Sequence, residues 1–434
     1  MAATLDQFVS RVRSLSESEK YAELVETIEK STEMLARNIS HATNVLESLD
    51  PERHSLGHLA VLSVKTSMPS VPDIESCIHQ IAAFIKSCAP EQIRYAAESY
   101  CLLCHFYAKS LVDLKKPLRG IDTIRLATEK LQPSMSCLTS IHADLAQLCL
   151  LSKCLKPAIP FLDSDVSDFV QEGGRFDVKP FLLYYYYGGM IYTGLKQFER
   201  ALHFFEVAVT TPAQALSAIM LEAYKKYIVV SLLLHGKVGL LPKYTSGVVA
   251  RYLKPMCGAY NDLSAAYSSN SSAELQRVVA KHTDIFTRDT NMGLVKQVVA
   301  SMNRKNILRL TKTFLTLSLT DVANRVHLSG SKEAEEYVLR MIEDGEIFAT
   351  IDQAAGMVSF HDSPESYSDD RMRVHIDSEI QKSMKLTRQI QQMDQDIAVN
   401  PQFVRKTLGL QADEDVSLSF VVSRSLRTGE PYVM

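Results

Sequence analysis

The sequence lacks most features that would point to an extracellular, membrane or nucleic-acid-binding protein. It has no tryptophan, and its net charge of −3 gives it no overall basic character, whereas a dedicated nucleic-acid binder usually has a strongly basic face. The longest apolar run, near Tyr227–Leu234, is far shorter than the ~20 residues that span a bilayer. The N-terminus has neither a basic start nor an apolar run, so it is not typical of a secretory signal. We expect a soluble intracellular protein.

Motifs of catalysis and nucleotide binding are also missing. The sequence has no HExxH, no HxH followed by the spaced aspartate of JAMM-type isopeptidases, no GxxxxGK or GxGxxG, and no GxSxG. The scattered histidines fit structural roles better than a catalytic site. We predict no cofactor, no metal, no small-molecule substrate and no enzymatic activity.

The eight cysteines lie mostly in apolar runs, which favours small core residues over a disulfide frame. Cys101, Cys104 and His105 have the spacing of a c-type haem attachment site. That chemistry needs an export route, and the surrounding residues are those of an apolar helix, so we interpret both cysteines as core residues.

Prolines divide the first half of the chain at almost regular intervals. Because proline lacks an amide donor and clashes with the preceding turn, we expect these positions to end helices. The intervals between them leave room for helices of roughly 12–20 residues. Apolar residues recur there at helical spacing, with no comparable strand alternation before about residue 345. The pattern predicts a solenoid of helix pairs.

One stretch, residues 184–212, has the spacing of a tetratricopeptide (TPR) repeat. Small residues would let the two helices approach closely, and aromatic rings would fill the space beside that contact. Gly194 is the predicted turn between the helices. The packing positions are Gly189, Tyr192, Ala201, Phe205 and Ala208.

The pattern changes after Asn306. Short helices are predicted at 307–314, 319–327 and 332–344, the second with Thr320 as a candidate cap. Apolar runs at 347–351 and 357–360 then flank a polar stretch, which predicts a hairpin. Three helices followed by a hairpin make a winged helix, here at residues 306–362.

The C-terminal part is mostly polar. Residues 361–371 form a predicted linker, and 372–397 a long helix with a weak apolar seam. The remainder, 398–434, is acidic and polar and is predicted to be disordered.

The winged helix raises DNA binding as an alternative. The predicted reading helix, 332–344, carries two basic and five acidic residues, and such a helix repels a duplex. The preceding helix is basic, but that fits a solvated or protein-facing surface equally well. We predict no nucleic-acid partner.

Two features are candidate protein interfaces. An open strand edge of the wing could pair with another chain, and neighbouring winged helices can continue one sheet. The candidate wing residues, part of which would support the fold, are Ile347, Phe348, Ile351, Val358 and Phe360. Those of the C-terminal helix are Ile376, Ile380, Ile390 and Ile397. In the alternative, this helix packs back on its own solenoid.

Helical repeats that lead into a winged helix and a trailing helix resemble the PCI-domain family, which occurs in the proteasome lid, the COP9 signalosome and translation initiation factor three. Several segments are closely similar to the signalosome's third-subunit family, over residues 1 to about 406. They are SMPSVPDIE (67–75), LTSIHADLAQLCLLSKC (138–154), YYYYGGMIYTGLKQFERAL (184–202), FTRDTNMGLVKQ (286–297), TKTFLTLSLTDVANRVHLSG (311–330), EEYVLRMIEDGEIFATI (335–351) and VNPQFV (399–404). The sequence after Gly409 departs from the family.

The resemblance implies an all-α fold with strands only in the wing. We expect a right-handed α-solenoid of TPR-like helix pairs that ends in a winged helix, followed by the long C-terminal helix. The expected domains are an N-terminal repeat array at 1–196 and a PCI domain at 197–365, with helical repeats at 197–305.

The resemblance also implies a non-catalytic scaffold in a complex that removes a ubiquitin-like modifier from cullins of cullin–RING ubiquitin ligases. The isopeptidase would be a JAMM subunit, and the partners would be the other PCI subunits and the JAMM-containing subunits. The implied location is nucleus and cytoplasm. The alternative is a scaffold subunit of the proteasome lid or of translation initiation factor three.

Overall fold

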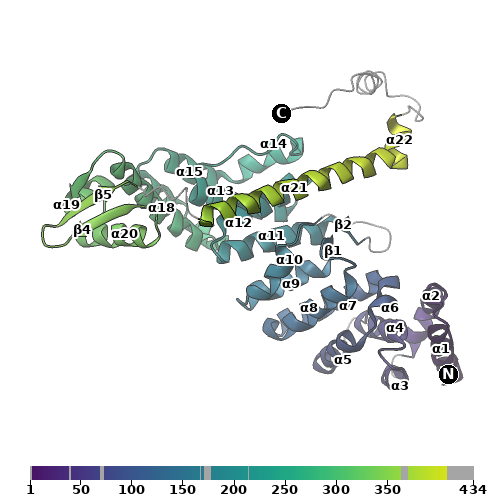
Figure 1. The fold of residues 1–434 in the computed structure, drawn as a ribbon. Coiled ribbons are helices and arrows are strands. Elements are labelled where there is room, and N and C mark those ends of the chain that lie inside the picture. The colour runs from purple at the N-terminus through teal and green to yellow at the C-terminus, as the bar shows by residue number, and fades with distance from the viewer. Residues whose placement is uncertain are drawn as a thin grey trace.

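The computed structural model describes residues 2–38, 41–68, 73–166, 168–170, 177–213, 215–362 and 370–407. The predicted tail beyond Thr407 and most of the predicted linker, at 363–369, lie outside these ranges. Figure 1 shows an elongated array of helices that runs from the N-terminus to a small sheet, with one long helix, α21, beside the array.

The predicted helical array is confirmed. Its N-terminal part consists of α1 (Ala2–Glu17), α2 (Tyr21–Arg37), α3 (Ala42–Ser48), α4 (Ser55–Thr66), α5 (Ile74–Ser87), α6 (Pro90–Tyr95), α7 (Ala97–Asp113), η2 (Pro117–Gly120), α8 (Ile121–Leu131), α9 (Ile141–Leu151), η3 (Lys156–Ala158), α10 (Ile159–Leu162) and α11 (Val178–Gly194). It continues with α12 (Phe198–Thr210), α13 (Ala218–His235), α14 (Gly247–Met256), α15 (Gly258–Ser268), α16 (Ser272–Lys281), α17 (Thr283–Arg288) and α18 (Met292–Thr311).

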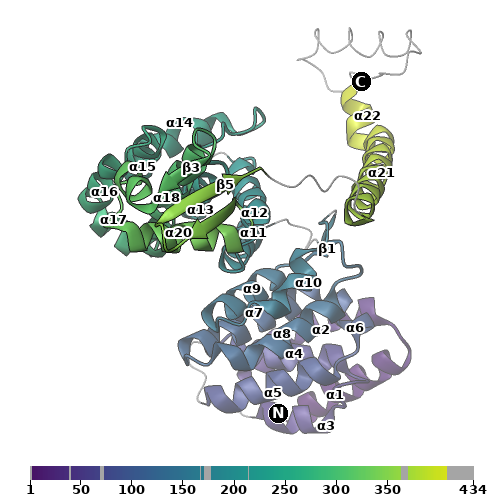
Figure 2. The same ribbon diagram turned by 60° about the vertical axis from the view of Figure 1, so that its left-hand side comes forward.

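Buried apolar residues form one continuous core along most of this array. It extends from Leu59 in α4 to Met302 in α18, while the first four helices add a smaller core around Val12 and Leu24. Each helix pair contacts mainly its neighbours, as in other solenoids. Figure 2 shows the N-terminal helices stacked at one end and the C-terminal half of the array at the other.

Several prolines begin helices where we expected them to end helices. Pro90 and Pro117 stand at the first turn of α6 and η2, and Pro180 lies in the first turn of α11. The amide groups of a first turn have no partner within the helix, so proline loses nothing there. The prolines therefore mark helix boundaries, but their spacing does not tell whether a given proline begins or ends a helix.

The turn of the TPR-like pair also differs from expectation. Helix α11 extends through Gly194, and the residue with left-handed backbone geometry is Lys196, with φ of 61°. Gly194 is instead needed for space, because a Cβ there would lie 2.9 Å from a methyl group of Leu155.

The winged helix follows directly from α18. It contains β3 (Thr316–Ser318), α19 (Leu319–Val326), α20 (Ser331–Glu343), β4 (Phe348–Asp352) and β5 (Met357–His361). The three strands are antiparallel in the order β3-β5-β4, so β5 is central. Its own core includes Val322, Val338 and Met341.

Three expectations for this domain were wrong. Its first helix is no separate element but the last part of the 20-residue α18. The cap of α19 is Ser318, whose Oγ accepts the Asp321 amide at 3.0 Å; Thr320 lies inside the helix. Strand β3 was not predicted because three residues are too few for a visible alternation.

A second short sheet lies in the repeat array. It pairs Cys137–Leu138 (β1) in parallel with Asp168–Phe169 (β2), and it was not predicted because its strands are even shorter.

The C-terminal helix α21 extends over Asp370–Val399 and is followed by α22 (Pro401–Thr407). Residues 401–407 are therefore helical, contrary to the predicted disorder of this part. Pro401 interrupts the amide ladder but is well suited to start a new helix. Among the described helices, none has the length and apolar character that a membrane crossing needs.

Candidate protein-interaction surfaces

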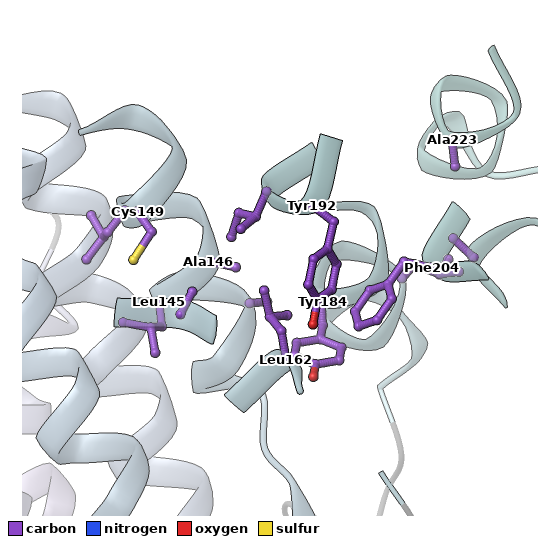
Figure 3. Close-up of a cluster of buried hydrophobic side chains, with 14 of the residues drawn as sticks. Leu145, Ala146, Cys149, Leu162, Tyr184, Tyr192, Phe204 and Ala223 are labelled. Atoms are coloured by element: carbon purple, nitrogen blue, oxygen red, sulfur yellow. The ribbon is translucent and has the colours of Figure 1, made fainter. Parts of the chain in front are cut away.

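The TPR-like packing positions lie together at the α11–α12 contact. Tyr192, Ala201, Phe205 and Ala208 are all fully buried. A Cβ on Gly189 would lie 2.6 Å from the Phe205 ring, and one on the preceding Gly188 would lie 2.6 Å from Phe204. The helices can approach this closely only because both positions are glycine. Figure 3 shows Tyr184, Tyr192 and Phe204 close together in this core.

A carboxylate fixes the end of this pair. The Tyr192 hydroxyl donates to Asp163 Oδ1 at 2.6 Å, and the Arg200 guanidinium donates to the same oxygen. Burial raises the pKa of Tyr192 to about 12, so the phenol remains a donor at neutral pH. These contacts connect α12 and α11 to the loop after α10. The repeat residues therefore serve the chain's own packing.

The five candidate wing residues divide between the core and the surface. Ile347, Val358 and Phe360 are buried in the winged-helix core, and Ile351 packs against that core. Phe348 is 40% exposed. It is thus the one of the five whose side chain is available to a partner, while the other four shape the strands.

Strand β4 has an open edge. The Phe360 amide donates to Leu315 and the Leu319 amide to Gly356, so even-numbered residues of β5 bond toward β3. Since antiparallel ladders alternate, odd-numbered residues of β5 bond toward β4, where their partners are Phe348, Thr350 and Asp352. The backbone groups of Ala349 and Ile351 consequently face away from β5, at the free edge of the sheet.

Three basic residues in and next to the winged helix have contacts within the chain. Arg304, the first basic residue of the region, pairs with Asp344 at 2.8 Å and with Glu346 at 2.9 Å. Lys305 lies over the Tyr267 ring at 4.9 Å, and Arg340 pairs with Glu336 on α20. Of the basic residues of α18, Arg304 thus neutralises two acidic residues that follow α20.

The four isoleucines predicted for the C-terminal helix all lie on α21 and are about half exposed. Ile376, Ile380, Ile390 and Ile397 have exposed fractions of 51%, 50%, 58% and 53%. The predicted seam did not include further apolar side chains of this helix that are also exposed: Val374, Met384, Leu386, Met393 and Val399. Met384, Leu386 and Met393 flank the isoleucines around the helix, whereas Val374 and Val399 lie on its opposite face.

One ion pair joins the described part of α21 to the array. Lys385 Nζ lies 3.2 Å from Asp165 Oδ2, and both side chains are mostly exposed. Exposed pairs of this kind contribute ~1 kcal/mol or less. No side chain described in α21 is fully buried, so the seam is not packed against the solenoid.

The candidate haem and metal residues have structural positions. Cys101 and Cys104 are buried on α7. His105 Nδ1 lies 3.0 Å from Asp144 Oδ1, and this hydrogen bond raises the pKa of His105. In the described ranges, no group of three or more His, Cys, Asp or Glu side chains is placed to hold a metal.

Comparisons with known proteins agree with this architecture. Residues 18–249 match the family model for the N-terminal helical repeats of COP9 signalosome complex subunit 3, and residues 279–362 match the PCI domain. The COP9 signalosome complex subunit 3 of Drosophila melanogaster is 44% identical over 431 residues, which covers 95% of this chain and 97% of the relative. The protein of the same name from Dictyostelium discoideum is 38% identical over 379 residues and covers 87% and 90%. The chain belongs to the family of COP9 signalosome complex subunit 3.

Proposed function

We propose that this chain is a non-catalytic scaffold subunit of the COP9 signalosome. In this proposal the complex removes the ubiquitin-like modifier from cullins of cullin–RING ligases, and so regulates ubiquitin-dependent protein degradation. The catalytic centre belongs to a JAMM-containing partner subunit. The chain would work in the nucleus and cytoplasm.

The proposal rests on family membership together with two surfaces that have no packing partner within the described part of the chain. These surfaces are the α21 seam and the β4 edge. The isoleucines of the long helix α21 are half exposed. Full burial of an aliphatic side chain stabilises a structure or a complex by ~1.5–3 kcal/mol, so a partner that covers this seam would gain binding free energy. The open β4 edge offers backbone groups to a neighbouring strand. Both surfaces lie C-terminal to the repeat array, on elements that the array does not need for its own core.

Each surface would have its own role. The β4 edge would extend one sheet across adjacent winged helices of PCI subunits, with Phe348 covering the junction. The α21 seam would pack into a bundle with helices of other subunits, where knobs-into-holes contacts replace water. The repeat array would hold the two at a set distance and support further contacts along its length.

The test is an affinity purification of the tagged full chain from cells, followed by mass spectrometry and a cullin deconjugation assay. The proposal predicts a stoichiometric set of PCI subunits, a JAMM subunit and cleaving activity that depends on the JAMM subunit. Recovery with proteasome base subunits or ribosomal proteins would favour the alternative scaffolds. Recovery of the chain alone would contradict both.

A further inference from the structure

A groove lies where the repeat array meets the PCI domain, and we call it the elbow groove. It has a volume of about 940 Å³. Its walls come from α11, the start of α12, α13 and α18, with the loop after α20 at one rim. The residues used below are Phe198, Lys226, Asn291, Leu294 and Arg304, all of which line it.

Lys226 is an unusual residue in the wall of this groove, because it is a buried lysine. It is 5% exposed, yet no carboxylate in the described part of the chain forms an ion pair with it. Its ammonium donates to Asn291 Oδ1 at 2.6 Å and lies 5.9 Å from the centre of the Tyr186 ring. Burial lowers the pKa of Lys226, and Glu222 and Asp289 offset this only in part.

The neighbouring Lys225 shows what a satisfied lysine looks like here. Its Nζ lies 2.6 Å from Glu222 and 2.8 Å from Asp289. Asp289 is further held by the Tyr260 hydroxyl at 3.0 Å. The local carboxylates are therefore committed to Lys225, and a buried cation without a counterion is left at the wall of an open groove, which is costly.

The rest of the groove suits a peptide better than a small anion. Phe198 and Leu294 contribute apolar surface beside Lys226. At the rim, Arg304 is already neutralised by Asp344 and Glu346, so it does not compete for an incoming acid. A small anion would use Lys226 and leave the apolar surface uncovered.

We propose that the elbow groove binds an acidic segment of a partner protein, whose carboxylate pairs with Lys226 while an adjacent apolar side chain covers Phe198 and Leu294. This site is separate from the β4 edge and the α21 seam, and it goes beyond the scaffold role argued above. It gives the scaffold a surface that selects partners by charge.

The test places a photo-reactive benzoylphenylalanine at position 198 of the full chain within its purified assembly. A chain with the same residue at the exposed Leu118 is the control. Mass spectrometry then identifies the cross-linked segment, and a synthetic peptide of that segment is titrated against the full chain. The proposal predicts that the segment contains Asp or Glu within a few residues of the cross-link.

Matched lysine variants decide the role of the charge. Lys226→Met is expected to lower the affinity of the chain for the peptide roughly 30-fold or more, as for other buried charge pairs. Lys226→Arg is expected to retain most of this affinity. Lys226→Met should hardly change the melting temperature, whereas Lys225→Met should lower it clearly by leaving the Asp289 carboxylate without its lysine. A cross-linked segment without acidic residues, no cross-link above the Leu118 control, or unchanged affinity of Lys226→Met would each overturn the proposal. Assembly of the wild-type chain is read separately, so failure here leaves the scaffold role intact.

Discussion

Helices α11 and α21 both carry many apolar residues, but these residues are buried in α11 and exposed in α21. In α11 the residues Leu182, Tyr184, Ile191 and Tyr192 are fully buried against the helices on either side. In α21 every isoleucine of the seam is half exposed. Apolar periodicity therefore shows that a helix needs a packing surface, while the chain's own contacts show whether that surface is internal.

The difference in composition explains the two outcomes. Helix α11 is apolar on most of its faces, which is typical of a helix enclosed by neighbours. Helix α21 carries one apolar seam among charged and amide side chains, which is typical of a helix with a single partner face. Substitutions in the α11 contact should therefore lower the stability of the chain, whereas substitutions in the α21 seam should weaken assembly and leave the chain folded.

The largest effect is expected at the α11–α12 contact. Gly189→Val would place its Cβ 2.6 Å from the Phe205 ring, and the branched side chain adds more volume, so a loss beyond the ~1–3 kcal/mol typical of overpacking is expected. Chemical denaturation of the purified chain measures this loss. The control is Gly293→Ala in α18, where a Cβ has nothing within 4 Å and where a gain of up to ~1 kcal/mol is expected. If both substitutions changed the free energy of unfolding equally, the close approach of α11 and α12 would not be the reason why position 189 needs glycine.

The second prediction concerns the seam. Ile380→Asp with Ile390→Asp should leave the helical content of the isolated chain nearly unchanged, because both side chains are half exposed and each substitution costs at most ~0.7 kcal/mol of helix propensity. The same double variant should weaken assembly at least roughly tenfold, since charges then face a partner's apolar surface. Circular dichroism and quantitative pull-down measure the two effects. Gln381→Asp with Gln391→Asp, elsewhere on the helix, is the matched control. Loss of helix in the isolated seam variant would mean that the seam packs internally.

The third prediction uses the alternation of β4. Thr350→Pro should cost ~1 kcal/mol or more, because it removes an amide that bonds to β5. Ala349→Pro removes an amide that faces away from the sheet, so the winged helix should stay folded while pairing with a neighbour is weakened. Thermal melts of the chain and recovery of PCI partners separate the two. Normal partner recovery with Ala349→Pro would exclude this edge as an interface.

The fourth prediction is a pH dependence inside the repeat array. His142 is buried, its Nδ1 accepts the Thr139 amide at 3.1 Å, and burial lowers its pKa from 6.5 to about 4. Below pH 6.5 the unfolded chain takes up a proton that the folded chain excludes, so this contribution is complete above 6.5 and declines toward 4. Between pH 7 and 5 the loss from this residue is ~2 kcal/mol.

His142→Asn tests this pH effect, because an asparagine oxygen can still accept the Thr139 amide but does not titrate. Other buried histidines affect both proteins alike, so the difference between wild type and variant isolates position 142. Denaturation midpoints at pH 7 and pH 5 give that difference. The same pH dependence in both proteins would contradict the burial of a neutral His142.

Much of the fold could be predicted because its signals are local. The spacing of small and aromatic residues at 184–212 predicts a close helix pair, and three helices followed by a hairpin predict the winged helix. What could not be predicted depends on distant contacts or on very short elements. The β1–β2 pair joins Cys137 to Asp168 through two residues in each strand, and α18 continues past the expected domain boundary because no residue there interrupts its helix.

The candidate interfaces were predictable only in part. The α21 seam is visible as a period, but the sequence does not tell whether its own solenoid covers it. In the wing, alternation identifies which residues belong to strands. The register of β4 against β5 shows the face of each side chain: Val358 pairs with Ile351 on the core face, and Phe348 pairs with His361 on the exposed face. The elbow groove leaves no local signal, since Lys226 and Asn291 are far apart in the chain and meet only in the folded protein.

Hydrogen exchange of the isolated full chain, compared with the same chain in its assembly, would decide whether α21 and β4 are interfaces. We expect α21 and β4 to exchange readily in the isolated chain and to become strongly protected in the assembly, while α11 is protected equally in both. If α21 is already protected in the isolated chain, or gains no protection on assembly, the seam is not an interface and the proposed scaffold role fails.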